Sequence, residues 1–232
     1  METIRFRVIA KMKTDFPEKF GIPRQSGLAE SVKGTVIFEP EYRDPAAIKG
    51  IEGYDRLWLL WVFSKNKREE WSPTVRPPRL GGNKRVGVFA TRSPYRPNPV
   101  GLSSVRLLGV RDDPKYGTVL DVSGADLADG TPIIDIKPYL TYADAYPDAG
   151  CGFSDEISYR KLSVVIPEEI ASVLGGERKT ELTEILSEDP RPHYQNDPER
   201  VYGFFYAEYE IKFRVNGVTA TVISAEKRPN GR

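Results

Sequence analysis

The sequence predicts a mainly β protein: a single-domain β-barrel of short strands with a small α+β domain at its C-terminus. Two observations favour the barrel. Short alternating or β-branched segments separated by turns fill the first two thirds of the chain, and no long amphipathic helices alternate with them. A third observation marks the second domain, because helical spacing and a hairpin pattern appear only after about residue 163. We expect the domains to span 1–165 and 166–232.

Short strands are expected wherever alternation or β-branched residues recur between turn signals. They are Ile4–Val8, Gly34–Phe38, Leu57–Phe63, Val86–Ala90, Val105–Val110, Thr118–Val122 and Ile133–Ile136. Leu57–Phe63 is apolar throughout, which indicates a strand buried on both faces. Its aromatic residues Trp58, Trp61 and Phe63 are interpreted as core residues. Ala46–Ile51 is expected to add a helical turn.

The last third has a different pattern. Pro167–Leu174 and Arg178–Ser187 have helical spacing with two glycines between them, and prolines follow the second segment. Strict alternation from Ala207 to Val215 then leads to Asn216-Gly217, which predicts a hairpin turn into Val218–Ser224.

An unusual loop is expected between Trp71 and Pro99. Six prolines in this stretch exclude regular helix or central strand over much of it. The longer stretch Trp71–Arg111 has eight positive charges and no acid, whereas Asp112–Glu156 has ten acids and two lysines, so the net charge of +1 hides a strong segregation. Folded onto one surface, the basic stretch would attract phosphates. Alternatively, its arginines pair with the later acids inside one domain.

Several classes of protein are excluded or disfavoured. The single cysteine, Cys151, cannot form an internal disulfide, and with only His193 beside it no zinc set of ordinary spacing can be assembled. We therefore expect no metal and a reducing compartment. No leader pattern opens the chain, and the apolar run Leu57–Phe63 is far shorter than the roughly 20 residues of a membrane span. The expectation is a soluble, cytoplasmic protein. Motifs for dinucleotides, P-loop nucleotides and zinc proteases are absent.

Three long strings are far more specific than any single glycine motif. They are Lys19–Leu28; Val75–Asn83 continued by Val88–Pro94 and Arg96–Ser103; and Gly124–Tyr139. Shorter matches are Gly50–Glu52, Leu57–Trp58 and Asp189–Pro192. Together they resemble the TsaA/TrmO family, the tRNA N6-threonylcarbamoyladenosine methyltransferases, over nearly the whole chain. The connecting segments 112–117 and 149–157 depart from the family pattern.

The resemblance implies methyl transfer from S-adenosylmethionine to N6 of threonylcarbamoyladenosine beside the anticodon of tRNA, on a barrel that works as a homodimer. Residues 1–165 would form the S-adenosylmethionine-binding methyltransferase domain, and 166–232 would contact tRNA or the second subunit. The reaction is an in-line displacement at a sulfonium, so the protein must mainly align the donor and the acceptor.

The candidate cofactor-binding residues lie in the matched strings or directly after the expected buried strand. They are Arg24, Gln25, Ser26, Ser64, Lys65, Arg92, Leu102, Asp129, Gly130, Thr131 and Pro132. Arg92 would pair with the methionyl carboxylate, since a guanidinium matches a carboxylate in bidentate fashion. Leu102 is equally compatible with a core position, and Asp129–Pro132 is by itself an ordinary turn.

The candidate catalytic residues Asp135, Lys137 and Tyr139 alternate along one extended segment and so share a face. Asp135 would accept the N6 proton while Lys137 or Tyr139 orients the nucleotide. The alternative is that Asp135 and Lys137 only form an ion pair on the rim of the barrel. The candidate RNA-binding residues are Arg76, Arg79, Lys84, Arg85, Arg96 and Arg191, whereas His193 is interpreted as a surface residue.

Two other functions fit part of the pattern. A non-catalytic RNA-binding barrel would use the basic loop but would not bind S-adenosylmethionine without RNA. A small-molecule methyltransferase would bind the cofactor but would not need the clustered positive charges, so the salt dependence of substrate capture would distinguish it.

Overall fold

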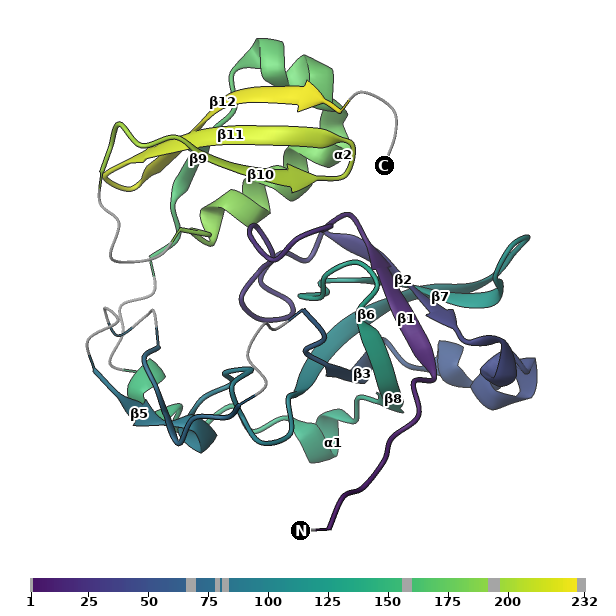
Figure 1. Cartoon of the computed structure of the whole chain (residues 1–232). Coiled ribbons are helices and arrows are strands. Elements are labelled where there is room, and N and C mark those ends of the chain that lie inside the picture. The colour runs from purple at the N-terminus through teal and green to yellow at the C-terminus, as the bar shows by residue number, and fades with distance from the viewer. Residues whose placement is uncertain are drawn as a thin grey trace. The chain divides into compact units, whose positions relative to one another are not determined.

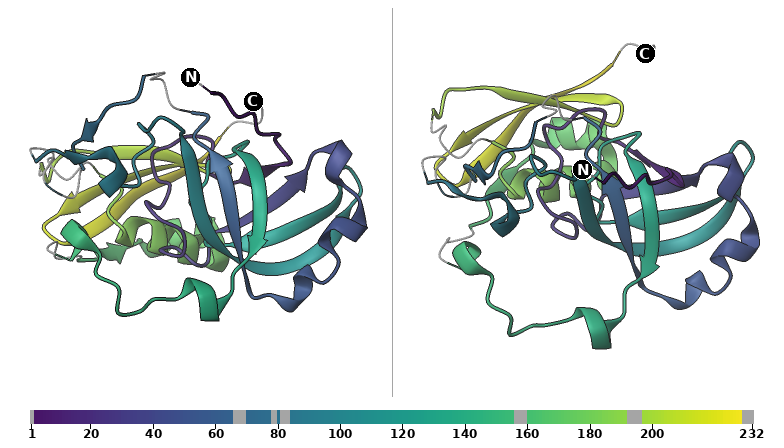
Figure 2. Two further views of the ribbon diagram at one scale, coloured as in Figure 1. Left: turned by 90° about the horizontal axis from the view of Figure 1, so that it is seen from below. Right: turned by 60° about the horizontal axis from the view of Figure 1, so that its bottom comes forward.

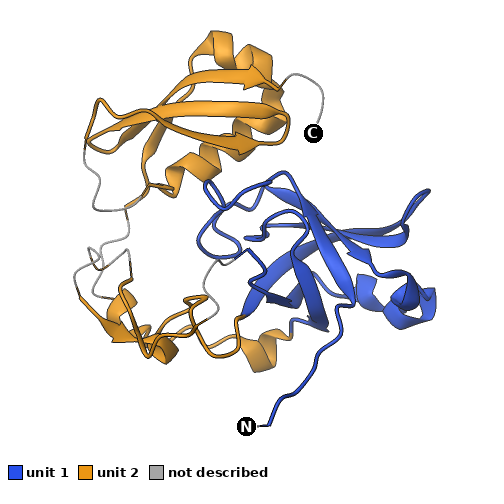
Figure 3. Ribbon diagram, viewed as in Figure 1, with its two compact units in different colours: residues 1–66, 100–139 blue, residues 67–99, 140–232 orange. Residues whose placement is uncertain are grey.

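The structure is a computed structural model that describes residues 2–65, 70–77, 80, 84–155, 160–191 and 197–228. The chain divides into two compact units (Figure 3). The first comprises residues 1–66 and 100–139, and the second comprises residues 67–99 and 140–232. The Pro- and Arg-rich loop therefore interrupts the sequence of the first unit and belongs to the second.

The first unit is a closed barrel of six antiparallel strands (Figures 1 and 2). The strands follow one another around the barrel in the order β1-β2-β7-β6-β3-β8, and β8 pairs with β1 to close it. Their bounds are β1 Ala10–Thr14, β2 Lys33–Phe38, β3 Arg56–Val62, β6 Val100–Asp113, β7 Gly117–Ser123 and β8 Pro132–Pro138. The prediction of a mainly β protein is confirmed.

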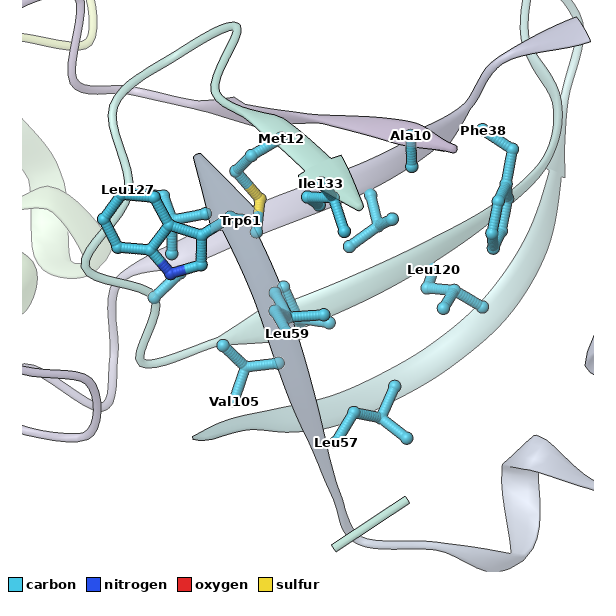
Figure 4. Packing of buried hydrophobic residues seen from close by; sticks show 13 residues of the cluster. Ala10, Met12, Phe38, Leu57, Leu59, Trp61, Val105, Leu120, Leu127 and Ile133 are labelled. Atoms are coloured by element: carbon cyan, nitrogen blue, oxygen red, sulfur yellow. The ribbon is translucent and has the colours of Figure 1, made fainter. Parts of the chain in front are cut away.

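The barrel encloses one hydrophobic core (Figure 4). In β3 the side chains of Leu57, Leu59 and Trp61 are buried inside, while the alternate residues are half-buried on the outer face. Thus β3 has period-2 burial with both faces largely shielded from solvent, close to the expected doubly buried strand. Met12, Leu120 and Ile133 complete the middle of the core from three other strands.

Two predicted strands of the first two thirds are wrong. Ile4–Val8 alternates but forms no strand; the first ladder begins at Ala10, and Ile4 and Phe6 are exposed. The reason is that a strand needs a neighbouring backbone, and residues 2–8 pair with no strand in the part of the chain that the structure describes. Val86–Ala90 is strand only at β5, Val86–Gly87, and then turns into a 3₁₀ helix, η5, at Val88–Ala90. The helical turn near residue 46 is present as η2, Pro45–Ile48, between the turns η1 at Pro40–Tyr42 and η3 at Ile51–Gly53.

The second unit contains the loop and the C-terminal domain. In the loop, β4 at Thr74–Val75 pairs with β5 to form a small ribbon. Short helical turns follow at α1, Thr141–Asp144, and η6, Gly152–Ser154. The C-terminal domain is a four-stranded sheet with α2, Glu168–Ser187. Its strands run β10-β11-β12-β9 across the sheet, with bounds β9 Ser163–Val165, β10 Tyr202–Tyr206, β11 Tyr209–Asn216 and β12 Thr219–Lys227.

The C-terminal elements match the sequence pattern closely. Gly175 lies at φ 76° and ψ 169° inside α2, so two helical segments meet there as the glycine pair predicts. The hairpin turn is present between β11 and β12, where Gly217 has φ 57°. The domain begins a few residues before the expected boundary at 165/166, because β9 pairs in parallel with β12. Within the described part of the chain, no helix has the length and apolar character needed to cross a membrane.

Candidate functional site

The outer face of three neighbouring barrel strands brings several predicted site residues together. Leu60 on β3 is paired with Leu102 on β6 and with Asp135 on β8. These three side chains therefore form one row across the strands, with the Cα atoms of Leu102 and Asp135 roughly 10 Å apart. Leu102 is 49% exposed, so it is not a core residue. The candidate cofactor contact and the candidate base thus share one surface.

A second row lies beside the first. Trp58 on β3 is paired with Ser104 on β6 and with Lys137 on β8. The ring of Tyr139 packs against Trp58 with 5.5 Å between centroids. Trp58 is half-buried on the outer face, so it does not lie in the barrel core as the sequence suggested. These side chains give the surface an aromatic part next to its charged part.

Asp135 and Lys137 form an ion pair on this surface, with 2.9 Å between Nζ and Oδ2. The other carboxylate oxygen of Asp135 accepts a hydrogen bond from the backbone N–H of Ile136 at 2.9 Å. Both side chains are accessible, at 61% for Lys137 and 42% for Asp135. The ion pair of the alternative interpretation is therefore present, and it holds the carboxylate in a fixed position where a ligand can reach it.

A buried hydrogen-bond chain supports β6 from inside the barrel. The indole N–H of Trp61 donates to Ser103 Oγ at 2.9 Å, and the Ser103 hydroxyl donates to Asp126. Gly101 lies against the Trp61 ring so closely that a Cβ there would be 2.3 Å from Cε2. Gly101 and Ser103 thus face inward and fix Leu102 outward. This chain could not be found from the sequence, because it depends on the register of β3 against β6.

The segment 24–27 is attached to the same strand. The Ser26 hydroxyl oxygen accepts a hydrogen bond from the backbone N–H of Ser104 at 3.1 Å. The Gly27 N–H donates to the carbonyl of Gly124 at 2.9 Å, and Gly124 itself has φ 74°. Gln25 donates to the Arg24 carbonyl at 2.6 Å. The first and third family strings therefore meet beside β6, with Arg24, Gln25 and Ser26 half-buried.

The turn at Asp129–Pro132 is bound to β1. Gly130 has φ 76°, and its N–H donates to the Met12 carbonyl at 2.8 Å. Asp129 Oδ1 accepts from the Thr14 N–H at 3.1 Å. The Thr131 hydroxyl is buried and donates to the Ala128 carbonyl at 2.7 Å. Thr131 thus has a structural role, while Asp129 and Gly130 remain exposed for contact with a ligand.

Ser64 and Lys65 are exposed just beyond β3. Lys65 Nζ donates to the carbonyl of Pro17 at 2.8 Å, which joins the end of β3 to the segment before the first family string. Both residues lie in the barrel unit, as do Arg24–Ser26, Leu102 and the Asp129–Pro132 turn. Arg92 is exposed but belongs to the second unit.

Three of the six predicted RNA-binding residues are exposed cations of the loop. Arg76, Lys84 and Arg85 are exposed and Arg96 is half-buried, whereas Arg79 lies outside the described residues, as does His193. Arg85 Nη1 donates to Thr74 Oγ1 at 2.9 Å, and Arg96 Nη2 donates to the Thr91 carbonyl at 3.2 Å. Both bonds are to neutral oxygens, so neither bond neutralises the positive charge of the guanidinium.

Arg191 is corrected by the structure. Its side chain is 9% exposed and forms a double hydrogen bond with Asp189, Nε to Oδ1 at 2.8 Å and Nη2 to Oδ2 at 2.9 Å. This partnership raises the pKa of the Arg191 guanidinium. A phosphate contact would have to break this largely buried bidentate pair. Arg191 is therefore better explained as a structural residue of the turn after α2.

One arginine outside the loop, Arg111, pairs with acids of the following stretch 112–156, as the alternative interpretation of the basic stretch proposed. Arg111 on β6 forms ion pairs with Asp121 at 2.6 Å and with Asp113 at 2.9 Å. The Arg111 guanidinium lowers the pKa of Asp113 and has its own pKa raised by the two carboxylates. Arg111 therefore does not add to the charge that the loop presents. Among the described residues, no group of three or more His, Cys, Asp or Glu residues is arranged to hold a metal ion.

Comparison with known proteins assigns both parts of the chain. Residues 11–145 match the family described as tRNA-methyltransferase O N-terminal domain, and residues 160–228 match the TrmO C-terminal domain. The chain belongs to the TrmO family. A crystal structure of TrmO from Pseudomonas aeruginosa superimposes with a TM-score of 0.76 at 31% identity, covering 97% of this chain and all of that one.

Two relatives in the same family have informative names. The tRNA (adenine(37)-N6)-methyltransferase of Escherichia coli K12 is 38% identical over 236 residues, which is 98% of this chain and 100% of the relative. A Pseudomonas aeruginosa relative, whose name assigns it to the S-adenosylmethionine-dependent methyltransferases, is 39% identical over 202 residues, 84% of this chain and 85% of its own length. The family resemblance seen in the sequence is thereby confirmed.

Proposed function

We propose that this protein transfers a methyl group from S-adenosylmethionine to N6 of threonylcarbamoyladenosine 37, beside the anticodon of tRNA. The observation that carries the proposal is end-to-end similarity to the Escherichia coli tRNA (adenine(37)-N6)-methyltransferase, with both TrmO domains present. The outer barrel face that brings together Leu102, Asp135, Lys137 and Tyr139 supports the proposal.

The residues at this face suit the chemistry of the cofactor. Leu60, Leu102 and the half-buried Trp58 offer apolar and aromatic contact for an adenosyl group. The exposed groups of Asp129 and Gly130, together with the segment Arg24–Ser26, offer polar atoms for ribose and adenine edges. Arg92 belongs to the second unit, where it is exposed, and its guanidinium suits the carboxylate of the cofactor. When bound, S-adenosylmethionine supplies an electrophilic methyl group on a sulfonium.

Asp135 is the proposed proton acceptor. The N6 of a threonylcarbamoylated adenosine resembles a urea nitrogen and is a poor nucleophile until its proton is removed. Asp135 presents an accessible carboxylate whose position is fixed by Lys137 and by the Ile136 N–H. Asp135 would take the N6 proton and so leave the nitrogen electron pair available. The bound cofactor would supply the methyl group and would leave as S-adenosylhomocysteine when its bond from sulfur to the methyl carbon breaks. Lys137 and Tyr139 would orient the nucleotide.

The proposal includes two partners and a location. We propose that tRNA binds through the loop cations Arg76, Arg79, Lys84, Arg85 and Arg96, and that the C-terminal domain contacts tRNA or a second subunit. A homodimer and a cytoplasmic location are also proposed from the family resemblance. The loop charge supports the tRNA part, because phosphate contacts supply most of the affinity for nucleic acid.

One experiment tests the function directly. The protein is incubated with S-adenosylmethionine labelled in the methyl group and total RNA, and the RNA is digested to nucleosides. Label in methylated threonylcarbamoyladenosine supports the proposal. Binding of RNA without binding of S-adenosylmethionine would instead assign a non-catalytic RNA-binding barrel, and transfer to small molecules alone would assign a small-molecule methyltransferase.

A further inference from the structure

The loop of the second unit is braced by its own hydrogen bonds. The Val88 N–H donates to the Pro73 carbonyl at 3.0 Å, and the Val88 carbonyl accepts from the Thr91 N–H at 3.1 Å and the Thr91 hydroxyl at 2.8 Å. The Ser72 N–H donates to the Tyr95 carbonyl at 3.2 Å. These bonds join the two ends of the loop around the ribbon β4–β5 and hold η5 in place.

Within this braced turn, adjacent residues have opposite environments. Val88 is 1% exposed and anchors η5, whereas Phe89, the next residue, is 73% exposed. A single exposed apolar residue is normal on a protein surface. Phe89 differs because hydrogen bonds hold the backbone on both sides of it, at Val88 and Thr91. The ring therefore projects from a segment of defined conformation.

The sequence around Phe89 is positively charged. From Trp71 to Pro99 it has no acid, and the described cations Lys84, Arg85 and Arg92 are exposed within five residues of Phe89. An exposed aromatic ring in a segment with cations and no acids matches the chemistry of an unpaired nucleotide. The ring offers a stacking surface for the base while the cations attract the phosphates on either side.

We propose that Phe89 is a stacking platform for an unpaired nucleobase of the RNA substrate. The proposal rests on the proposed function and adds a positioning residue to it. Phe89 would hold one unpaired base, and the neighbouring cations would hold the adjacent phosphates, so that the RNA loop is bound in one register. An unpaired base is available in the loop next to the anticodon, whereas a continuous duplex has none.

The test compares Phe89→Ala and Phe89→Tyr with the wild type in binding an anticodon stem–loop RNA over a series of salt concentrations. Phe89→Ala should weaken binding about 5- to 150-fold, the range of base-stacking losses on alanine substitution. The slope of log affinity against log salt should stay unchanged, because no phosphate contact is lost. Phe89→Tyr should restore most of the affinity. Affinity for a fully paired duplex of the same stem should be the same in all three proteins.

Phe6→Ala is the matched control, since Phe6 is a similarly exposed phenylalanine, at 67%, outside the loop. It should leave stem–loop affinity unchanged. The platform is overturned if Phe89→Ala binds the stem–loop like wild type, or loses equal affinity for the duplex. It is also overturned if Phe89→Ala changes the sedimentation of the free protein, which would place Phe89 between two copies of the chain. Absence of methyl transfer by the wild type would refute the proposed function instead, because the stacking test reads binding alone.

Discussion

At the scale of single residues, Asp135 is the position where two interpretations of the site make different predictions. Asp135→Asn keeps the shape of the side chain but cannot accept a proton, so single-turnover methyl transfer should slow by about 10²- to 10⁴-fold. Affinities for S-adenosylmethionine and tRNA should stay near wild type. Rapid-quench measurement with saturating enzyme checks the rate.

If the ion pair with Lys137 is only structural, the outcome differs. The pair is exposed, so breaking it should change stability by no more than about 1 kcal/mol. Lys137→Met breaks the same pair but keeps the carboxylate, so a purely structural role predicts the same small change in stability in both variants. An Asp135→Asn enzyme with the wild-type single-turnover rate would leave alignment of donor and acceptor as the main source of catalysis.

Arg92 gives a second residue-scale prediction. Arg92→Ala should weaken binding of S-adenosylmethionine, because a guanidinium is the natural partner of the methionyl carboxylate. The fold should persist, since Arg92 is exposed in its loop. Calorimetric titration, with thermal melting as a check of folding, measures both. Unchanged affinity in a folded variant would remove Arg92 from the cofactor site.

Single residues differ in how far the sequence predicts them. The alternation Asp135, Lys137, Tyr139 predicted a shared face, and the 2.9 Å ion pair together with the Trp58–Tyr139 contact bears this out. Arg191 was predicted to bind RNA, whereas in the structure it pairs with Asp189 two residues earlier, and the sequence alone does not reveal the turn geometry that allows this pair. The chain from Trp61 to Asp126 joins residues 65 positions apart and required the strand register.

At the scale of elements, the position of β6 against β3 depends on glycine. Gly101→Ala would place a Cβ 2.3 Å from the Trp61 ring, which is held in the core by its bond to Ser103. Overpacking of this kind typically costs about 1–3 kcal/mol. Thermal or urea unfolding should show the loss. Gly109→Ala on the same strand is the matched control, since nothing lies within 4 Å of its added Cβ, and equal losses in both variants would contradict the argument.

Helix α2 contains a carboxyl group whose protonation should affect stability. Glu181 is 1% exposed, and burial raises its pKa despite the Arg178 guanidinium 2.9 Å away. The folded state therefore binds this proton more tightly than the unfolded state. The tighter proton binding adds to the free energy of unfolding. This contribution is fully present below pH 4.5, the ordinary pKa of the group, and is lost as the pH rises through the raised pKa of the folded state.

Glu181→Gln removes this titration, so its melting temperature minus that of the wild type should increase as the pH is raised from below 4.5 toward neutrality. Melting curves at a series of pH values measure the difference. Glu169→Gln, at an exposed position in the first turn of α2, should show no such trend. A difference for Glu181→Gln that does not change with pH would mean that the Arg178 pair offsets the burial completely.

Elements were predictable where a local pattern decides them. The glycine pair of α2 and the Asn216-Gly217 turn are local signals, and both elements formed as expected. Ile4–Val8 has an equally clear alternation, yet forms no strand, because strand formation also needs a partner that no local pattern specifies. Val86–Ala90 was cut short by η5, which the hydrogen bonds of Val88 stabilise.

At the scale of the whole molecule, charge segregation is the property that composition conceals. A net charge of +1 suggests no polyanion partner, whereas the stretch from Trp71 to Pro99 has six cations and no acid. In the barrel unit, the positive charge of Arg111 is neutralised by its ion pairs with Asp113 and Asp121. The hydrogen bonds from Arg85 to Thr74 and from Arg96 to Thr91 go to neutral oxygens, so these two bonds do not neutralise the charge of the loop. We therefore expect the loop to supply electrostatic attraction for the proposed tRNA substrate.

This assignment predicts how salt affects tRNA binding. Each phosphate contact releases condensed counterions, so log affinity decreases with log salt. The magnitude of this negative slope becomes smaller by roughly 0.7–0.9 for each contact removed. Arg85→Ala should flatten the slope by about that amount and weaken tRNA binding, while affinity for S-adenosylmethionine should stay constant because Arg85 is not among the candidate cofactor-binding residues. Charge reversal at Arg85, alone or together with Arg79, should increase the loss of tRNA affinity.

Arg111→Ala is the matched control. It also removes one positive charge from an exposed arginine, but the Arg111 guanidinium already forms ion pairs with two carboxylates. It should leave the salt slope at the wild-type value. Filter-binding titrations of all variants at several salt concentrations provide the slopes. If Arg85→Ala and Arg111→Ala flatten the slope equally, the effect follows the net charge of the protein rather than the loop, and the loop is not the surface that binds the tRNA backbone.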